Sequence, residues 1–240
     1  MCIRDSFFTT RFIEGESLAS ILERLAAADE RTIEHYSLLT LLGIWQKVCD
    51  AVAFAHSHGV VHTALTPDVV EVGRFGEVFV TQWSLALVQA EPFGDTQHVS
   101  APESTASAPL SPYSAPEQAA GLLHEIDVRT DVFALGGLLY RILTLHDPLR
   151  GETDDALLEA ALNAAVTPPA KTSPAPHWPR GRFPEFPAAV AMKALSYAHD
   201  DRHKSVPDLQ REIAAWQEGV SSGTDVGTLW KQFAGVLRQH

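Results

Sequence analysis

VHTALTPDVVE, residues 61–71, is the stretch that decides the interpretation of this chain of 240 residues. Three of its positions hold Ala64, Thr66 and Val69. None of these side chains can accept a proton, carry a charge or bind a hard cation at neutral pH. The stretch therefore lacks acid–base and metal chemistry at positions 64, 66 and 69.

The residues on either side predict a loop between a long helix and a hairpin. Residues 37–58 carry a wide apolar arc with helical spacing, and Gly59 is placed to end that helix. Two short β-branched runs, 69–72 and 78–81, surround the sequence Gly-Arg-Phe-Gly. Such a pattern is typical of a β-hairpin.

Residues 62–69 resemble the catalytic loop of eukaryotic-like serine/threonine protein kinases. The family pattern His-Arg-Asp-Leu-Lys-Pro-Glu-Asn appears here as His-Thr-Ala-Leu-Thr-Pro-Asp-Val. The resemblance implies that Ala64 stands in place of the catalytic base and Thr66 in place of the phosphate-binding lysine. Val69 then stands in place of a magnesium ligand, whereas His62 keeps the structural histidine of the family.

A second motif follows at residues 78–86, VFVTQWSLA, which is similar to the strand and turn that carry Asp-Phe-Gly in the family. Gln82 falls where the second magnesium ligand is expected. Its neutral amide supplies no negative charge to offset a dication. Ser84 replaces the glycine that gives this turn its backbone freedom.

Motifs of the scaffold are better kept. Residues 113–118, YSAPEQ, resemble the Ala-Pro-Glu segment, and residues 131–136 resemble the Asp-x-x-x-x-Gly start of a central helix. The resemblance implies a buried ion pair between Glu117 and Arg202, against the alternative of two separate surface charges. It also implies that Asp131 accepts hydrogen bonds from backbone amides of the catalytic loop.

The likeness sets the predicted domain organisation. Residues 7–217 form a protein-kinase-like domain made of the hinge and the large lobe, with the small lobe truncated. Residues 1–6 are an unmatched N-terminal stub, and residues 218–240 are a linker with an amphipathic C-terminal helix. The hinge positions, which contact nucleotide in the family, fall on Arg11, Phe12 and Ile13.

The predicted fold class is mainly α (α+β): a helical bundle of the large-lobe type with a short β-hairpin and a remnant hinge strand over residues 7–12. Residues 132–145 are apolar nearly all round, which favours a central buried helix. Proline-rich residues 167–187 cannot be regular structure. Further helices are expected at residues 154–165, 187–197 and 205–216.

Composition excludes several classes of function. A net charge of −12 argues against nucleic acid and anionic membrane surfaces, because those partners need clustered Lys and Arg. No apolar run reaches the roughly 18 residues of a membrane span, so a cytoplasmic protein is expected. Cys49 lies on an apolar helix and is expected to be buried. His56, His58 and His62 are close in sequence, but structural roles are favoured over metal binding.

These observations favour a catalytically inactive pseudokinase that acts as a binding, scaffolding or regulatory module. No cofactor is expected, although the family uses ATP with magnesium. Protein partners are expected but not identified. Two alternatives stay open: a fragment of a serine/threonine kinase with residual ATP-dependent phosphotransferase activity, and a receptor fragment. In the latter, a membrane anchor beyond residue 240 would place the chain on the cytoplasmic face of a membrane.

Overall fold

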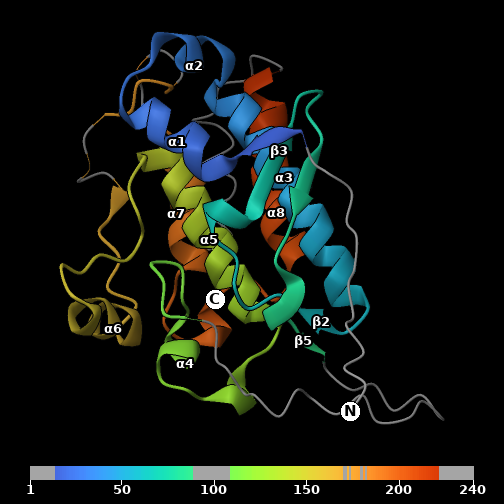
Figure 1. Cartoon of the computed structure of the whole chain (residues 1–240), viewed down its shortest axis with the longest axis vertical. Helices are drawn as coiled ribbons and strands as arrows, with labels where there is room; N and C mark the ends of the chain where they lie inside the picture. The colour runs from blue at the N-terminus through green and yellow to red at the C-terminus, as the bar shows by residue number, and fades with distance from the viewer. Residues whose placement is uncertain are drawn as a thin grey trace, which may run out of the picture.

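A computed structural model describes residues 14–88, 109–169, 172, 174–178, 181 and 183–221. The predicted mainly helical fold is confirmed, with small antiparallel sheets beside a helical bundle (Figure 1). The α-helices of this part are α1 (Leu18–Ala26), α2 (Glu30–His35), α3 (Leu38–Ser57), α4 (Pro116–Ala119), α5 (Val128–Thr144), α6 (Asp154–Leu162), α7 (Glu185–Ala194) and α8 (Val206–Ser221). The strands are β1 (Gly15–Ser17), β2 (Val60–Val61), β3 (Val70–Gly73), β4 (Val78–Val80) and β5 (Leu87–Val88).

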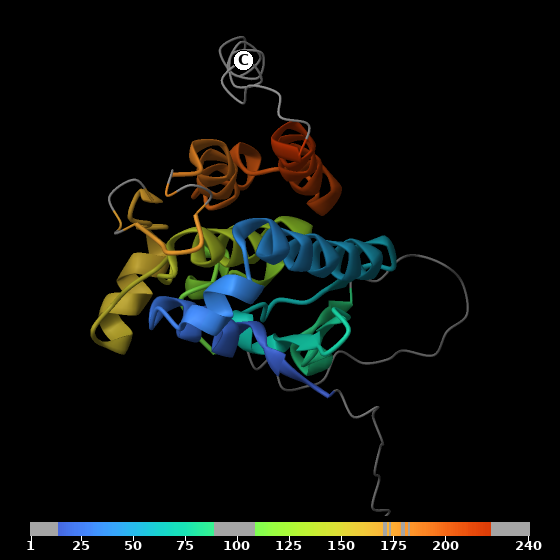
Figure 2. The same cartoon turned by 90° about the horizontal axis from the view of Figure 1, so that it is seen from above.

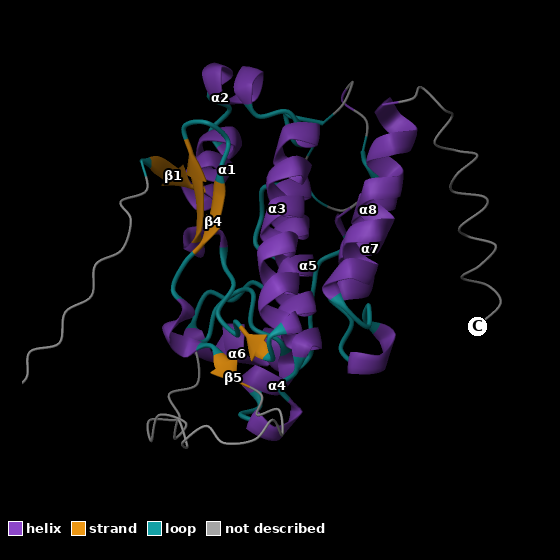
Figure 3. Cartoon of the chain, turned by 90° about the vertical axis from the view of Figure 1, so that its right-hand side faces the viewer, coloured by secondary structure: helices purple, strands orange, loops and turns teal. Residues whose placement is uncertain are grey.

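The core lies between α3 and α5, which cross in the middle of the molecule. Helices α7 and α8 cover one side of this pair, while the sheet and α1 lie on the other (Figures 2 and 3). The indole of Trp45 on α3 is fully buried and donates to the carbonyl of Leu135 on α5 at 3.0 Å. Cys49 is fully buried on the same helix, as expected.

Local sequence signals explain where α3 begins and ends. The hydroxyl of Ser37 accepts a hydrogen bond from the amide of Thr40, which satisfies a donor that the helix itself leaves free. Gly59 has φ +69° directly after the helix, a left-handed conformation that glycine adopts without steric cost. The helix therefore delivers the chain into residues 61–69 at a fixed point.

Two small sheets hold the loop from either side. Strands β1, β3 and β4 pair in the order β1-β3-β4, all antiparallel, with Val70 opposite Val80 and Gly15 opposite Gly73. Strand β2 pairs with β5. The predicted hairpin is present, although residues 67–69 form a 3₁₀ turn and β3 starts at Val70.

Several predicted boundaries were wrong. Helix α5 begins at Val128 rather than residue 132, because the carboxylate of Asp127 caps it by accepting from the amide of Arg129 at 2.7 Å. Helix α8 continues to Ser221, so the first four residues of the predicted linker 218–240 are helical. The stub 1–6, the remnant strand 7–12 and residues 222–240 lie outside the described residues.

By length and composition, α3 could cross a membrane, and within the described residues no other helix meets that test. The sequence expectation of no span-length apolar segment is corrected to this extent. The apolar side chains of α3 are needed in the core, where they face α5 and α8. The helix is a central element of the lobe.

Candidate functional site

The carboxylate of Asp131 organises the loop at residues 62–69. It is 1% exposed in the first turns of α5. One oxygen accepts from the amide of His62 at 2.8 Å and the other from the amide of Thr63 at 2.9 Å. The imidazole Nε2 of His56, at the end of α3, lies 2.7 Å from the first of these oxygens. The structure thus places Asp131 where it holds the loop backbone against both central helices.

The side chain of His62 links the loop to the turn after β4. Its Nδ1 accepts from the amide of Ala64 at 3.3 Å, so the proton of the neutral ring is on Nε2, which donates to the carbonyl of Thr81 at 2.9 Å. Burial lowers the pKa of His62, although its hydrogen bond to that carbonyl opposes the shift. The ring also packs edge-on against Trp83, with centroids 4.5 Å apart. His62 is therefore neutral and connects the loop to the turn after β4.

Thr63 holds the loop from a third direction. Its φ of +65° is left-handed, which is unusual for a β-branched residue. Its hydroxyl donates to the carbonyl of Leu85 at 2.9 Å, and its own backbone carbonyl accepts from the side-chain Nε2 of Gln118 at 2.7 Å. Gln118 in turn accepts from the amide of Ala115 at 3.1 Å. Sequence reasoning gave no role to Gln118, because a glutamine after a motif carries no distinctive signal.

The other four predicted positions lie around this frame. Val69 is 3% exposed and belongs to the core, and its carbonyl accepts from the amide of Thr81 at 2.8 Å, next to Gln82. Gln82 is exposed and has φ +60°. The turn therefore takes its left-handed residue at Gln82, and Ser84, expected to need that freedom, lies in a 3₁₀ turn. Ala64 and Thr66 are half-buried in the same loop.

The structure brings Glu117 and Arg202 together. Their side chains form a two-pronged ion pair with both N–O distances at 3.0 Å, each residue 3% exposed. All five donors of Arg202 are used, since the remaining three reach the carbonyls of residues 129, 196 and 197. Burial alone would raise the pKa of Glu117, but the hydrogen bonds and charge of Arg202 lower it to about 2. The hydroxyl of Thr130 adds a bond at 2.7 Å.

Comparison with known proteins places this frame in a family. The chain is 30% identical over 90% of its length to serine/threonine-protein kinase PknD of Protochlamydia amoebophila. It is 31% identical over 91% of its length to PknD of Chlamydia caviae. These relatives and the fold support a bacterial eukaryotic-like serine/threonine protein kinase family for the chain. It spans about a quarter of the length of these relatives, 23% and 24%.

A solved structure supports the kinase fold. The chain is similar to the crystal structure of the Rad53 kinase domain and SCD2 in complex with AMPPNP, with a TM-score of 0.59 at 20% identity. The match covers 84% of this chain and 65% of the other. No family model matches the chain.

The residues at the two metal-ligand positions of the family do not fit a magnesium ion. The side chain of Val69 is in the core, and Gln82 offers one neutral amide oxygen, so neither position supplies a carboxylate for a hard dication. Within the described ranges, no three His, Cys, Asp or Glu side chains are grouped to hold a metal ion. The hinge positions Arg11, Phe12 and Ile13 lie outside those ranges.

Proposed function

We propose that this kinase-like lobe does not transfer phosphate and acts as a protein-binding module. One observation carries the proposal: the carboxylate of Asp131 accepts from the backbone amides of His62 and Thr63 and so holds the loop, while Ala64, Thr66, Val69 and Gln82 stand at the positions of the family's reacting groups. Phosphoryl transfer depends on positioning and on charge stabilisation by metal ions and cations. A loop without these charged groups can keep its conformation but does not support phosphoryl transfer.

Phosphate transfer is measured directly with purified protein, radiolabelled ATP, magnesium or manganese, and a serine- and threonine-rich peptide. We expect no label in the peptide above the protein-free blank. Asp68→Asn is the matched variant, because Asp68 is the one carboxylate of residues 62–69 and is exposed. Transfer by the unaltered chain that this variant abolishes would overturn the proposal.

Nucleotide binding is a separate question, answered by thermal unfolding with ATP and each metal. A ligand that binds only the folded state raises stability by about 2.7 kcal/mol at 100 times its Kd. We expect no shift in the unfolding temperature with ATP and magnesium, because neither Val69 nor Gln82, at the two metal-ligand positions of the family, carries a charge.

The second candidate is residual phosphotransferase activity in a longer parent protein. It is favoured by the names of the relatives, which are kinases about four times longer than this chain. The same transfer assay, done on a parent protein that contains this lobe, separates the two. Activity that survives Asp68→Asn and deletion of the lobe would locate the chemistry elsewhere.

A further inference from the structure

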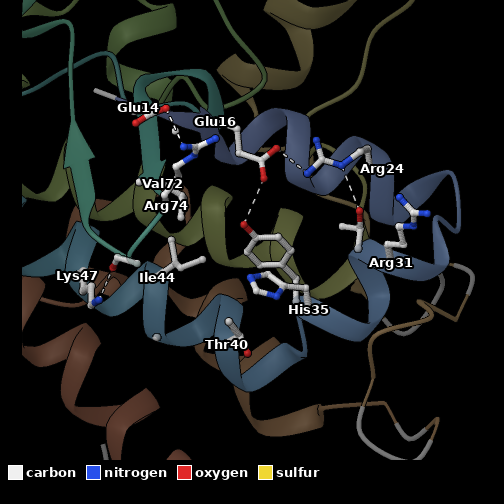
Figure 4. Close-up of a pocket in the computed structure, with 16 residues that line it drawn as sticks. Glu14, Glu16, Arg24, Arg31, His35, Thr40, Ile44, Lys47, Val72 and Arg74 are labelled. Carbon is white, nitrogen blue, oxygen red and sulfur yellow. Dashed lines mark hydrogen bonds and ion pairs between the residues drawn. The ribbon is translucent and has the colours of Figure 1, made fainter. Parts of the chain in front are cut away.

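A pocket of about 730 Å³ lies away from the loop at residues 62–69, in the described part of the chain. Its walls are β1 and the β3–β4 turn on one side and α1, α2 and α3 on the other (Figure 4). The loop at residues 62–69 and the Glu117–Arg202 ion pair do not border this pocket.

The pocket carries positive charge on an acidic chain. Four cations, Arg24, Arg31, Lys47 and Arg74, line it with two carboxylates, a net charge of +2, whereas the whole chain is −12. Both carboxylates are occupied: Glu16 pairs with Arg24 at 2.6 Å and Glu14 with Arg74 at 2.8 Å.

Two of the cations form no ion pair within the described residues. Lys47 donates to the carbonyl of Gly76 at 2.6 Å, and the charge of Arg31 acts only at longer range, on the carboxyl group of Asp29. A guanidinium and an ammonium group without ion pairs at one pocket attract an anionic ligand.

The shape of the pocket distinguishes a peptide from a small anion. Thr40, Gly43 and Lys47 line it along one face of α3, and seven residues of helix span about 10 Å. Figure 4 shows Arg31 at one end of the pocket and Lys47 at the other, so a ligand that contacts both groups extends along the pocket. Three extended residues cover about the same length.

An exposed apolar residue, Phe75, neighbours the pocket in sequence. Phe75 is 92% exposed and lies between two lining residues, Arg74 and Gly76, at the tip of the β3–β4 turn. An exposed aromatic ring offers an apolar contact to a side chain of a partner protein, whereas an inorganic ion makes no such contact.

We propose that this pocket is a docking groove for an acidic segment of a partner protein, bound in extended form along α3. Its carboxylates meet Arg31 and Lys47, and an apolar residue of the segment packs on Phe75. The inference extends the proposed binding role by giving it a surface and a partner chemistry.

The test is fluorescence anisotropy with two labelled peptides, one built of Glu, Asp, Leu and Gly and one with Lys in place of the acids. We expect saturable binding of the acidic peptide only, weakened by added salt. Arg31→Glu and Lys47→Glu together should weaken it about tenfold or more, since each removes a charge-assisted contact.

Lys204→Glu is the matched control, because Lys204 is exposed, lies outside the pocket and changes the net charge as much as either single variant. Its affinity should stay within about twofold of the unaltered chain. Equal binding by the double variant, equal binding of the basic peptide, or binding of inorganic phosphate without the acidic peptide would each overturn the proposal. The measurement needs no nucleotide, so its failure is distinct from failure of the phosphate-transfer proposal.

Discussion

At the scale of residues, the loop is held by side-chain acceptors that bond to its backbone amides. Asp131 receives two backbone amides and one imidazole, and His62 receives one amide and donates once. These bonds are made to main-chain atoms, so they form whether the residue at position 64 is Asp or Ala. The conformation of the loop therefore does not depend on the side chain at position 64.

Asp131→Ala tests this reading of the loop. The substitution leaves the amides of His62 and Thr63 buried without acceptors, and each such group costs about 1–3 kcal/mol. We expect a loss of about 3 kcal/mol or more in the free energy of unfolding, measured by chemical denaturation. Asp68→Ala, in the same loop but exposed, should change it by less than about 0.5 kcal/mol. Unchanged stability in Asp131→Ala would contradict the structure.

The ion pair of Glu117 predicts an acid limit to stability. Its folded pKa of about 2 is below the ordinary 4.5, so the unfolded chain takes up the proton first as the pH falls. The contribution is complete above about pH 4.5, is lost down to about pH 2, and amounts to about 3 kcal/mol at 1.36 kcal/mol per pH unit. Denaturation at stepped pH measures it.

Glu117→Gln should lower stability at neutral pH and flatten the pH dependence between about 4.5 and 2, because the amide does not titrate. Glu125→Gln is the control, since Glu125 is exposed on the nearby 3₁₀ turn. An equal slope in Glu117→Gln and the unaltered chain would show that another carboxyl group carries the effect.

At the scale of elements, α5 and α7 approach closely at Gly136. A Cβ at this position would lie 2.6 Å from the Cβ of Ala194, closer than packed atoms tolerate. The glycine of the Asp-x-x-x-x-Gly pattern is thus explained by helix packing rather than by backbone freedom.

Gly136→Ala should destabilise the fold by about 1–3 kcal/mol, because the helices must separate or shift. Gly43→Ala on α3 is a matched control of opposite sign: nothing lies within 4 Å of its added Cβ, and alanine favours a helix over glycine by about 0.5–1 kcal/mol. Thermal unfolding of both variants measures the difference. An increase in the stability of Gly136→Ala would mean that α7 can move away from α5 without a loss of packing energy.

Long elements were predictable and short ones were not. Helix α3 was predicted within a residue at each end, because its apolar arc, Ser37 and Gly59 act together. Helix α2 was missed, since six residues show no clear period and its start depends on one contact, the carboxylate of Asp29 accepting from the amide of Thr32 at 2.9 Å. The same kind of local cap moved the start of α5.

Sites followed a different rule. Glu117, Asp131 and Arg202 were identified because each falls on its own motif, whereas Gln118 and the conformation of Thr63 depend on contacts between segments far apart in sequence. The charged pocket could not be predicted at all. Its cations come from four separate segments of the chain, and only the fold brings them to one pocket.

At the scale of the whole molecule, buried histidines set a second acid response. Burial lowers the pKa of His62 in the loop and of His177, whose Nε2 donates to the carbonyl of Ile142 at 2.7 Å. Below about pH 6.5, these histidines therefore bind more protons in the unfolded chain than in the folded chain. We expect the free energy of unfolding to start falling below about pH 6.5, before Glu117 titrates.

His177→Gln should reduce that slope, because its amide can donate to Ile142 but does not titrate. His124→Gln should leave it unchanged, since His124 is exposed. Unfolding of the three proteins between about pH 7.5 and 5 decides the matter. Identical slopes in all three would assign the response to other groups.

The hydrogen bonds of the Arg202 guanidinium determine which segments can unfold locally. The guanidinium joins α4, the first turn of α5 and the chain after α7 through five bonds that share one planar group. These three segments cannot fray one at a time, because releasing any of them strands a buried cation. The slowly exchanging amides of these segments should give one common free energy of opening in hydrogen–deuterium exchange, as a single cooperative unit.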